Sequence, residues 1–588
     1  MPGTVNRQLL TNSSTPRGSA NRRDNYKERE GAQVILRSML VAAACVLGGT
    51  ACVERDDTQE PEPDPRTTEY RFVVEIRTDQ DKSDLAAFAR SALDEPVRVE
   101  PLFPEADPAD DPAGLSRIFV VSMQSTEPQR NVWDLSYELR DAGDFPAVEP
   151  DLQDALADVA ARSSAGCNDE GVPAPEDPGW ALRAMKAPEA WALPAEPGGR
   201  PFGEGARICH IDTGWTDHVD LDGDRLDLDN AWNALDRNAD AEDPLNYRGH
   251  PGHGVATGSV IMSSGGLSET GTTGPGLVTG VAPMSTLVPI RAMKNVVHFL
   301  DSDIARAVHR STISECDVIS MSLGGRAFFG LERAIGDAVS RGTVVAAAAG
   351  NCVGSVVAPA IYEDTIAVAA TNFESTPWMG SSKGSAVTVS APGEDVYRAR
   401  RHEPGDPTDV VEPGNGTSYA TAIVAGAAAL WIAHNGENSG PDGARQEKFR
   451  EAISATAVAP DNWDSARFGP GIVNLEALLL HESTTPPAAP AQEPRTPDEK
   501  VINLLARQTD FSPEDLRRGL EQLLDTTDLD RSIDRVGPEL LYLAATQPAV
   551  FRQSVNLAQA PSDLAAISTA KRRLADHSSK TLSALLGD

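Results

Sequence analysis

The sequence has few cysteines, a deficit of basic side chains and no long apolar run near its N-terminus. Six cysteines occur in 588 residues and none forms a CxxC pair, which argues against a cysteine-based metal site. The 52 basic and 87 acidic side chains give a formal net charge of −35, which argues against nucleic acid or anionic lipid as a partner. The apolar run Met39–Leu47 is too short to cross a bilayer.

That short run is instead typical of an export leader. Arg37 precedes it and small residues follow it as far as Cys52. We therefore predict a leader at residues 1–52 and a protein exported from a bacterial cell. About 30 polar residues precede the run, which indicates either a later translation start near Val34 or a long leader that carries a weak twin-arginine signal.

The end of the leader also has features of a lipoprotein processing site. The sequence GGTAC ends at Cys52, although Gly49 stands where such sites prefer a branched apolar residue. The exported protein is accordingly expected either to be secreted or to be held at the cell envelope by a lipid on Cys52. No other membrane contact is predicted, and we expect a monomer.

Four cysteines remain beyond the leader: Cys167, Cys209, Cys316 and Cys352. An exported chain could use all four in disulfides, and four cysteines permit three full pairings. The sequence does not choose among them.

Composition and periodicity divide the remaining chain into several parts. Residues 53–68 are acidic and proline-rich and read as a linker. Within residues 69–155, apolar alternation predicts strands at 70–76 and 118–123, each followed by a helix. Two strand–helix units of this size predict a small α+β domain of the split βαβ type.

Short apolar runs separated by helical patterns begin after residue 176. Strands that are apolar on both faces are typical of covered parallel sheets, so we predict an α/β sandwich with the site at the carboxyl ends of its strands. The predicted strands are 206–212, 286–293, 317–323, 343–349 and 365–371, with helices near 301–310 and 330–342.

A second proline-rich linker at 483–497 precedes a helical module at 498–588. Ser512 is a predicted helix cap and Pro513 takes the first helical position. Leucines at 516, 520, 523 and 524 follow on one face. This module shows no recognisable catalytic motif.

Three segments combine glycine with a residue able to take part in nucleophilic catalysis. HIDTG ends the first predicted strand at Asp212, GHGVATG opens a helix after His253, and GTSYA opens another at Ser418. The order aspartate, histidine, serine is one of the known arrangements of a catalytic triad. His250 is the competing base, but glycine follows His253 directly and a small-residue helix begins there.

With these motifs, the stretch from Asp177 to His481 resembles the subtilases, a family of subtilisin-like serine peptidases. The resemblance also rests on SMSLGG (320–325), AAAAGN (346–351), VTVSAPG (387–393) and FGPGIVNLEALL (468–479). It implies a three-layer catalytic domain at 177–482 with a mostly parallel sheet. It further implies that residues 69–155 are a propeptide, joined to that domain by a processing linker at 156–176.

The resemblance assigns roles to individual residues. Ser418 is the expected nucleophile, His253 the general base and Asp212 the group that orients it, with Asn351 as a donor to the oxyanion. Substrate-binding positions are expected at Ser322, Leu323, Gly324, Gly325 and Gly350. The predicted activity is cleavage of protein or peptide substrates by an acyl-enzyme route, and the chain's own propeptide is the expected inhibitor.

Several alternatives accompany this hypothesis. One is a catalytically inactive subtilase scaffold used for binding, and another is an esterase acting through Ser382 in the motif GSSKG. Ala422 and Cys352 depart from the family pattern, and a free thiol at Cys352 would make the enzyme sensitive to mercurials. No cofactor is required and no metal ligand is assigned, but the acidic runs 220–230 and 236–243 leave structural calcium as a hypothesis.

Overall fold

The computed structural model describes most of the chain beyond residue 67. Described are residues 68–127, 130–152, 176–221, 224–265, 278–297, 300–440, 443–482, 497–524, 526, 528–559 and 564–587. The predicted leader, its Cys52 and most of both predicted linkers lie outside the described residues, as does the predicted processing linker up to residue 175.

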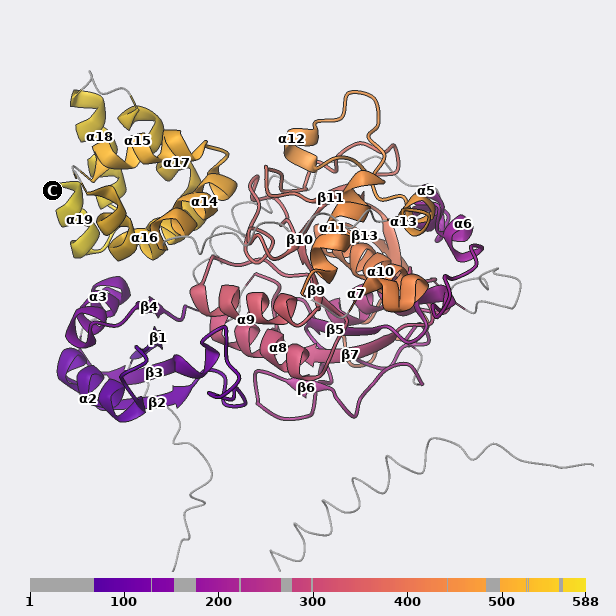
Figure 1. The fold of residues 1–588 in the computed structure, drawn as a ribbon, viewed down its shortest axis with the longest axis horizontal. Coiled ribbons are helices and arrows are strands. Elements are labelled where there is room, and N and C mark those ends of the chain that lie inside the picture. The colour runs from indigo at the N-terminus through magenta and orange to yellow at the C-terminus, as the bar shows by residue number, and fades with distance from the viewer. Residues whose placement is uncertain are drawn as a thin grey trace, which may run out of the picture. The chain divides into compact units, whose positions relative to one another are not determined.

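A seven-stranded sheet forms the centre of residues 177–482, the predicted catalytic domain, which is called the catalytic unit below (Figure 1). The strand order is β11-β10-β9-β8-β5-β7-β6, and every neighbouring pair is parallel. The strands are β5 (Arg207–Asp212), β6 (Trp232–Asn233), β7 (Thr286–Arg291), β8 (Val318–Met321), β9 (Val344–Ala348), β10 (Ile366–Thr371) and β11 (Val389–Pro392). All five strands predicted for this unit are present.

Helices cover both faces of this sheet, which explains why its strands are apolar on both sides. Along β5, Cys209 and Ile211 pack in one buried cluster with α8 and α9, whereas Ile208 packs in another with α7 and α10. These helices are α7 (His253–Met262), α8 (Asp301–Ile313), α9 (Phe329–Ser340) and α10 (Thr417–Asn435). The predicted three-layer α/β sandwich is therefore confirmed.

Shorter elements complete the catalytic unit. They are α5 (Trp180–Ala184), α6 (Ala187–Trp191), η2 (Pro201–Gly203), β12 (Val396–Ala399), β13 (Val411–Gly414), η3 (Gly436–Ser439), α11 (Arg445–Ala455), α12 (Ser465–Phe468) and α13 (Leu475–Leu479). Strands β12 and β13 pair antiparallel as a separate hairpin.

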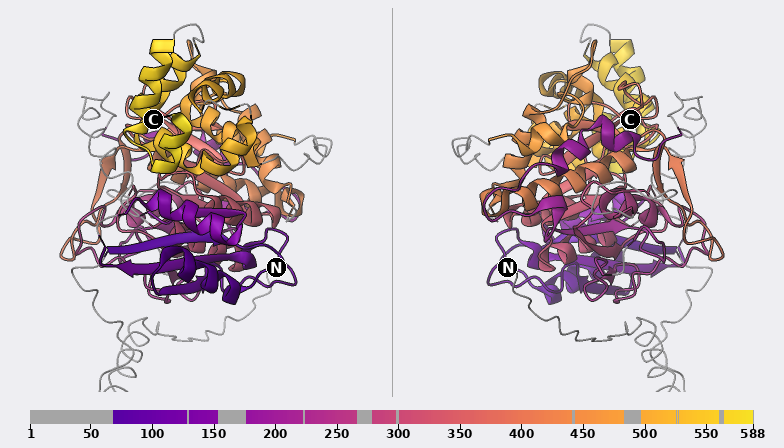
Figure 2. Two further views of the ribbon diagram at one scale, coloured as in Figure 1. Left: turned by 90° about the vertical axis from the view of Figure 1, so that its left-hand side faces the viewer. Right: turned by 90° about the vertical axis from the view of Figure 1, so that its right-hand side faces the viewer.

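The N-terminal unit is a four-stranded antiparallel sheet with both helices on one face (Figure 2). Its order is β2-β3-β1-β4. The elements are β1 (Thr68–Glu75), α2 (Lys82–Leu93), β2 (Val97–Pro101), η1 (Leu115–Arg117), β3 (Ile118–Ser125), α3 (Val132–Gly143) and β4 (Ala147–Pro150). Strands β2 and β4 were not predicted, because they are short and end in proline.

Side chains of β1 alternate between two cores. Phe72 and Val74 face the helices of their own unit, whereas Val73 belongs to the cluster that contains α8 and α9. The second face of the N-terminal sheet is thus covered by the catalytic unit.

In its described residues, the C-terminal part is a module of six helices. They are α14 (Pro497–Thr509), α15 (Pro513–Leu523), α16 (Leu529–Thr546), α17 (Pro548–Ala558), α18 (Leu564–Ala575) and α19 (Lys580–Leu586). The hydroxyl of Ser512 accepts a hydrogen bond from the backbone N–H of Asp515 at 3.1 Å, as expected of a cap. The four leucines predicted to share a face of α15 are all buried.

Helix α10 is the central helix of the catalytic unit. Within the described residues it is the one helix whose length and apolar composition would suit a membrane span, yet all of it is buried inside the fold. Its small residues permit close packing, since a Cβ at Gly426 would lie 2.7 Å from the Cβ of Val281.

One disulfide joins β5 to the segment before β8, between Cys209 and Cys316. Both cysteines are buried. Cys352 is also disulfide-bonded, so the free thiol considered at that position is excluded.

Removing the Cys209–Cys316 bridge should destabilise the catalytic unit. The bridge closes a loop of 107 residues, and loss of such a cross-link typically costs about 2–4 kcal/mol. We expect the double variant Cys209→Ala/Cys316→Ala to melt at a lower temperature than the unaltered protein. An unchanged melting temperature under non-reducing conditions would show that the bridge contributes nothing.

Candidate functional site

Asp212 and His253 are joined by a hydrogen bond at the carboxyl edge of the sheet. Strand β5 ends at Asp212 and helix α7 begins at His253, and the imidazole Nδ1 lies 2.7 Å from Asp212 Oδ1. The Asp212 side chain is fully buried, whereas 12% of the His253 side chain is exposed. One imidazole edge is therefore held while the ring remains accessible.

Further donors hold the Asp212 carboxylate. Oδ1 also accepts from the backbone N–H of Thr213 at 2.7 Å, and Oδ2 lies 3.1 Å from the hydroxyl of Thr257. Burial acts to raise the pKa of Asp212, but the charge of His253 and the hydrogen bonds from His253 and the Thr213 N–H lower it below the usual range. Asp212 is thus an ionised carboxylate.

Glycines allow α7 to approach the end of β5. A Cβ at Gly254 would lie 2.1 Å from the carbonyl oxygen of Gly214, and a Cβ at Gly252 would lie 1.5 Å from that of Arg401. Gly252 also has φ +75°, which L side chains rarely adopt. The glycine before and the glycine after His253 are therefore both required by close backbone contact.

The competing histidine, His250, lies on the loop before α7. Its ring centre is 6.3 Å from that of His253, and its backbone N–H donates to the carbonyl of Lys294. The imidazole that pairs with Asp212 is that of His253.

Ser418 is the second residue of α10, and it is bordered by Asn351. The side-chain Oδ1 of Asn351 accepts from the N–H and the hydroxyl of Thr417 at 2.9 and 2.8 Å. These bonds orient the side chain so that its Nδ2 lies on the side of Gly416, 3.3 Å from where a Cβ of that glycine would be. The hydroxyl of Ser322 donates to the carbonyl of Ser418 at 2.9 Å and ties the end of β8 to α10.

A cavity of about 60 Å³ opens beside Ser418 and Asn351. All five predicted substrate-binding residues line it: Ser322, Leu323, Gly324, Gly325 and Gly350. Two further lining residues, Gln508 of α14 and Ala545 of α16, come from the C-terminal module. The sequence carried no signal for these two, because they reach the cavity only through the packing of that module.

Ser382, the alternative nucleophile, is fully buried and its backbone N–H donates to the carbonyl of Gly350. Its Oγ would lie 3.2 Å from a Cβ at Gly350, and Ser382 is not among the residues that line the cavity. The position is unsuited to attack on a substrate.

In the acidic segments considered for calcium, carboxylates bond to other groups of the protein. Asp227 pairs with Arg207 at 2.8 Å and accepts from Asn230. Asp243 accepts from the Thr213 hydroxyl and the Gly252 N–H. Across the described part of the chain, which omits residues 222–223, no group of three or more histidine, cysteine or acidic side chains could hold a metal ion.

A three-layer α/β fold with a bonded aspartate–histidine pair at the edge of its sheet is an architecture that serine hydrolases use. Comparison with known proteins identifies the family. The family model of Peptidase S8, the subtilase family, matches residues 203–472. Thermitase from Thermoactinomyces vulgaris is 31% identical over 292 residues, which cover 48% of this chain and 94% of thermitase.

Two more relatives agree. Subtilisin DY from Bacillus licheniformis is 34% identical over 232 residues, 38% of this chain and 77% of that protein. The crystal structure of fervidolysin from Fervidobacterium pennivorans, a keratinolytic enzyme related to subtilisin, shares the fold. It has a TM-score of 0.51 at 20% identity over 72% of this chain and 62% of fervidolysin. The chain belongs to the subtilase family and is a subtilisin-like serine endopeptidase.

Proposed function

We propose that peptide bonds are cleaved by Ser418, with His253 as general base and Asp212 as its orienting carboxylate. The observation that carries this proposal is the 2.7 Å hydrogen bond between Asp212 and His253 beside the helix that begins at Thr417. Asp212 selects the tautomer that keeps the other nitrogen, Nε2, free to accept a proton, and it stabilises the imidazolium that forms.

The reaction proceeds in two halves. His253 takes the Ser418 proton as Oγ attacks the scissile carbonyl, then donates it to the leaving amine. Water later attacks the acyl-enzyme with the same base. Negative charge on the tetrahedral oxygen is met by Nδ2 of Asn351 and the N–H of Ser418, near the positive end of α10.

The cavity lined by Ser322–Gly325 and Gly350 would receive the substrate side chain that precedes the scissile bond. Its glycines leave room for a side chain between the two strand ends. This chemistry needs no cofactor, and calcium, if bound, would have a structural role only.

We further propose that residues 69–155 are an inhibitory propeptide and that the chain cuts itself between 156 and 176. The support is the contact at the end of β4. Asp151 accepts from the N–H and hydroxyl of Ser302 at 3.2 and 2.6 Å, at the N-terminus of α8. Arg326 bonds to the carbonyl of Pro150, so the segment leading to the cut is held on the catalytic unit.

Export is the proposed destination. The leader at 1–52 supports it, and the buried Cys209–Cys316 bridge is typical of an oxidising compartment. Whether the mature protein is released or held by a lipid on Cys52 depends on how that leader is processed. We propose that it acts as a monomer.

The Ser418→Ala variant should lose both peptide hydrolysis and labelling by a fluorophosphonate probe, because the probe reacts only with an activated serine. Absence of labelling in the processed, unaltered protein would instead support the inactive scaffold. Ester hydrolysis that survives in Ser418→Ala would support a second nucleophile such as Ser382.

The Asn351→Ala variant should keep its affinity for peptides but turn over about 100- to 1,000-fold more slowly. A loss of roughly 3–4 kcal/mol is typical when one side-chain donor to an oxyanion is removed. Steady-state kcat and KM on a peptide substrate measure this. A kcat within a few-fold of the unaltered enzyme would contradict the assignment.

Binding of the propeptide should weaken as the pH rises. Burial raises the pKa of Glu149 and of Asp301 to about 7 from 4.5 and 3.8, although the nearby charge of Arg326 lowers both. Both groups therefore take up protons on binding at pH values from about 4 to 7, and above that range the complex must bury their charged forms. Propeptide retention measured across this range should fall with pH, and Glu149→Gln/Asp301→Asn should flatten the profile.

A further inference from the structure

Helix α3 of the N-terminal unit contacts the C-terminal module, and the proposed reaction uses none of these contacts. The contacting side chains are spaced to share one face of α3. They are Trp133, Asp134, Tyr137, Arg140 and Asp141. On the module, the contacted residues belong to α16 and to the start of α19.

The centre of this contact is a buried carboxylate. Glu539 is 1% exposed and accepts hydrogen bonds from the Tyr137 hydroxyl at 2.7 Å and from the N–H and hydroxyl of Ser579 at 2.6 and 2.8 Å. Tyr137 is itself buried. A buried carboxylate is costly unless donors surround it, so the Tyr137 hydroxyl from the N-terminal unit completes a site on the module.

Two ion pairs, with the arginine on opposite sides of the contact, accompany Glu539. Arg140 donates to Asp534 at 2.8 Å, and Arg535 makes two bonds to Asp141 at 2.8 and 3.1 Å. Each partner thus contributes one arginine and one aspartate, which fixes the register of the contact.

The N-terminus of α19 supplies a further bond. Asp134 accepts from the N–H and the hydroxyl of Thr581, both at 3.1 Å. A carboxylate on the N-terminal unit therefore bonds to the first turn of α19, whose cap is Ser579.

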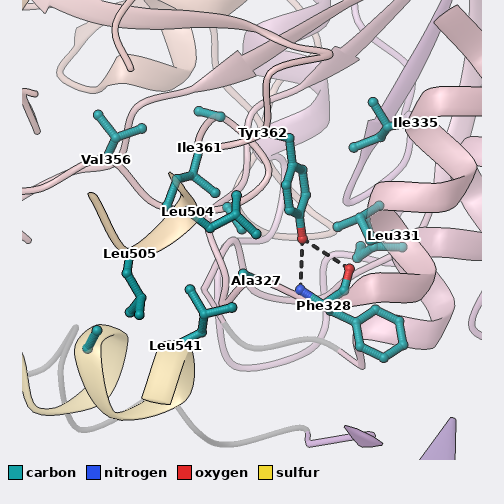
Figure 3. Close-up of a cluster of buried hydrophobic side chains, with 14 of the residues drawn as sticks. Ala327, Phe328, Leu331, Ile335, Val356, Ile361, Tyr362, Leu504, Leu505 and Leu541 are labelled. Carbon is teal, nitrogen blue, oxygen red and sulfur yellow. Dashed lines mark hydrogen bonds between the residues drawn. The ribbon is translucent and has the colours of Figure 1, made fainter. Parts of the chain in front are cut away.

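The same module also packs on the catalytic unit. Leu504, Leu505 and Leu541 belong to the buried cluster that contains Phe328 and Tyr362 (Figure 3). The Tyr362 hydroxyl bonds to the N–H and carbonyl of Phe328 at 2.8 and 3.1 Å, which secures the catalytic side of this cluster.

We propose that the C-terminal helical module is a second binding site for the N-terminal unit and retains it on the enzyme after the linker at 156–176 is cut. Since the module is anchored to the catalytic unit, the cut fragment must break two contacts to leave. Release of one leaves the other in place, so rebinding is intramolecular. The binding contact itself does not depend on the proposed propeptide role. Only its consequence for peptidase activity rests on that proposed function.

The test uses the full chain with Ser418→Ala and a recognition site for a sequence-specific protease placed between residues 156 and 176. After cutting, dissociation of the N-terminal fragment is followed on protein immobilised through its C-terminus. Self-cleavage is not needed, so failure of the peptidase proposal does not affect the measurement.

Charge-reversal variants test the contact between the N-terminal unit and the module. Asp141→Arg or Arg535→Asp places like charges together and should speed dissociation about 10-fold. The double exchange Asp141→Arg/Arg535→Asp restores opposite charges and should return the rate to within about 3-fold of the original. Rescue by the double variant would show that the effect of each single variant comes from this charge pair.

Tyr137→Phe should speed dissociation about 10-fold, because Glu539 loses a donor while still buried. Tyr70→Phe is the matched control, since the Tyr70 hydroxyl is also buried in the N-terminal unit and accepts from Arg130 of that unit. Equal dissociation rates for the unaltered chain, Tyr137→Phe and both single charge reversals would overturn the proposal.

In chains that retain Ser418, the faster-releasing variants should also shorten the lag before full peptidase activity. A shortened lag without faster release would contradict the inference. Absence of activity in every variant would instead count against the peptidase proposal.

Discussion

The site depends on a carboxylate kept out of water. Asp212 is fully buried, and a buried charge is stable in a protein only when a partner and hydrogen bonds replace its hydration. His253 supplies the partner, and Thr213 and Thr257 supply further donors. Since Asp212 ends a strand in the middle of a rigid sheet, the position of the imidazole is set by the fold.

Buried carboxylates that need a partner or hydrogen-bond donors also occur at the two contacts of the N-terminal unit. Near α8, Arg326 is buried among acidic groups that include Glu149 and Asp301. At the module, Glu539 is held by hydroxyl and N–H donors without an arginine bonded to it among its described contacts. In a chain with net charge −35, buried carboxylates thus recur where separate units meet, and each contact depends on the donors that surround the carboxylate.

The C-terminal module connects the proposed inhibitory propeptide to the cavity beside Ser418. Gln508 and Ala545 line the cavity beside Ser418, while Glu539 of the same module bonds to Tyr137. A single helical body therefore touches both the proposed inhibitor and the proposed specificity pocket. This position gives a structural reason for a helical extension beyond the subtilase match, which ends at residue 472.

Much of the fold could be predicted from sequence, because strands covered on both faces must be continuously apolar. The strands at 344–348 and 366–371 are of this kind. Strands β2 and β4 were missed since they are short, and their conformation is imposed by pairing with β3 and β1. The pairing of Cys209 with Cys316 was equally out of reach, because it depends on which strands become neighbours.

The sequence by itself determined the chemistry available: an aspartate, a histidine and a serine, each in a short segment that contains glycine. These are local properties that residue type and spacing encode. Only the tertiary structure decided that Cys209 pairs with Cys316, and that a module without catalytic motifs reaches the cavity. Both outcomes depend on contacts between residues far apart in the chain, which arise only when the separate surfaces pack.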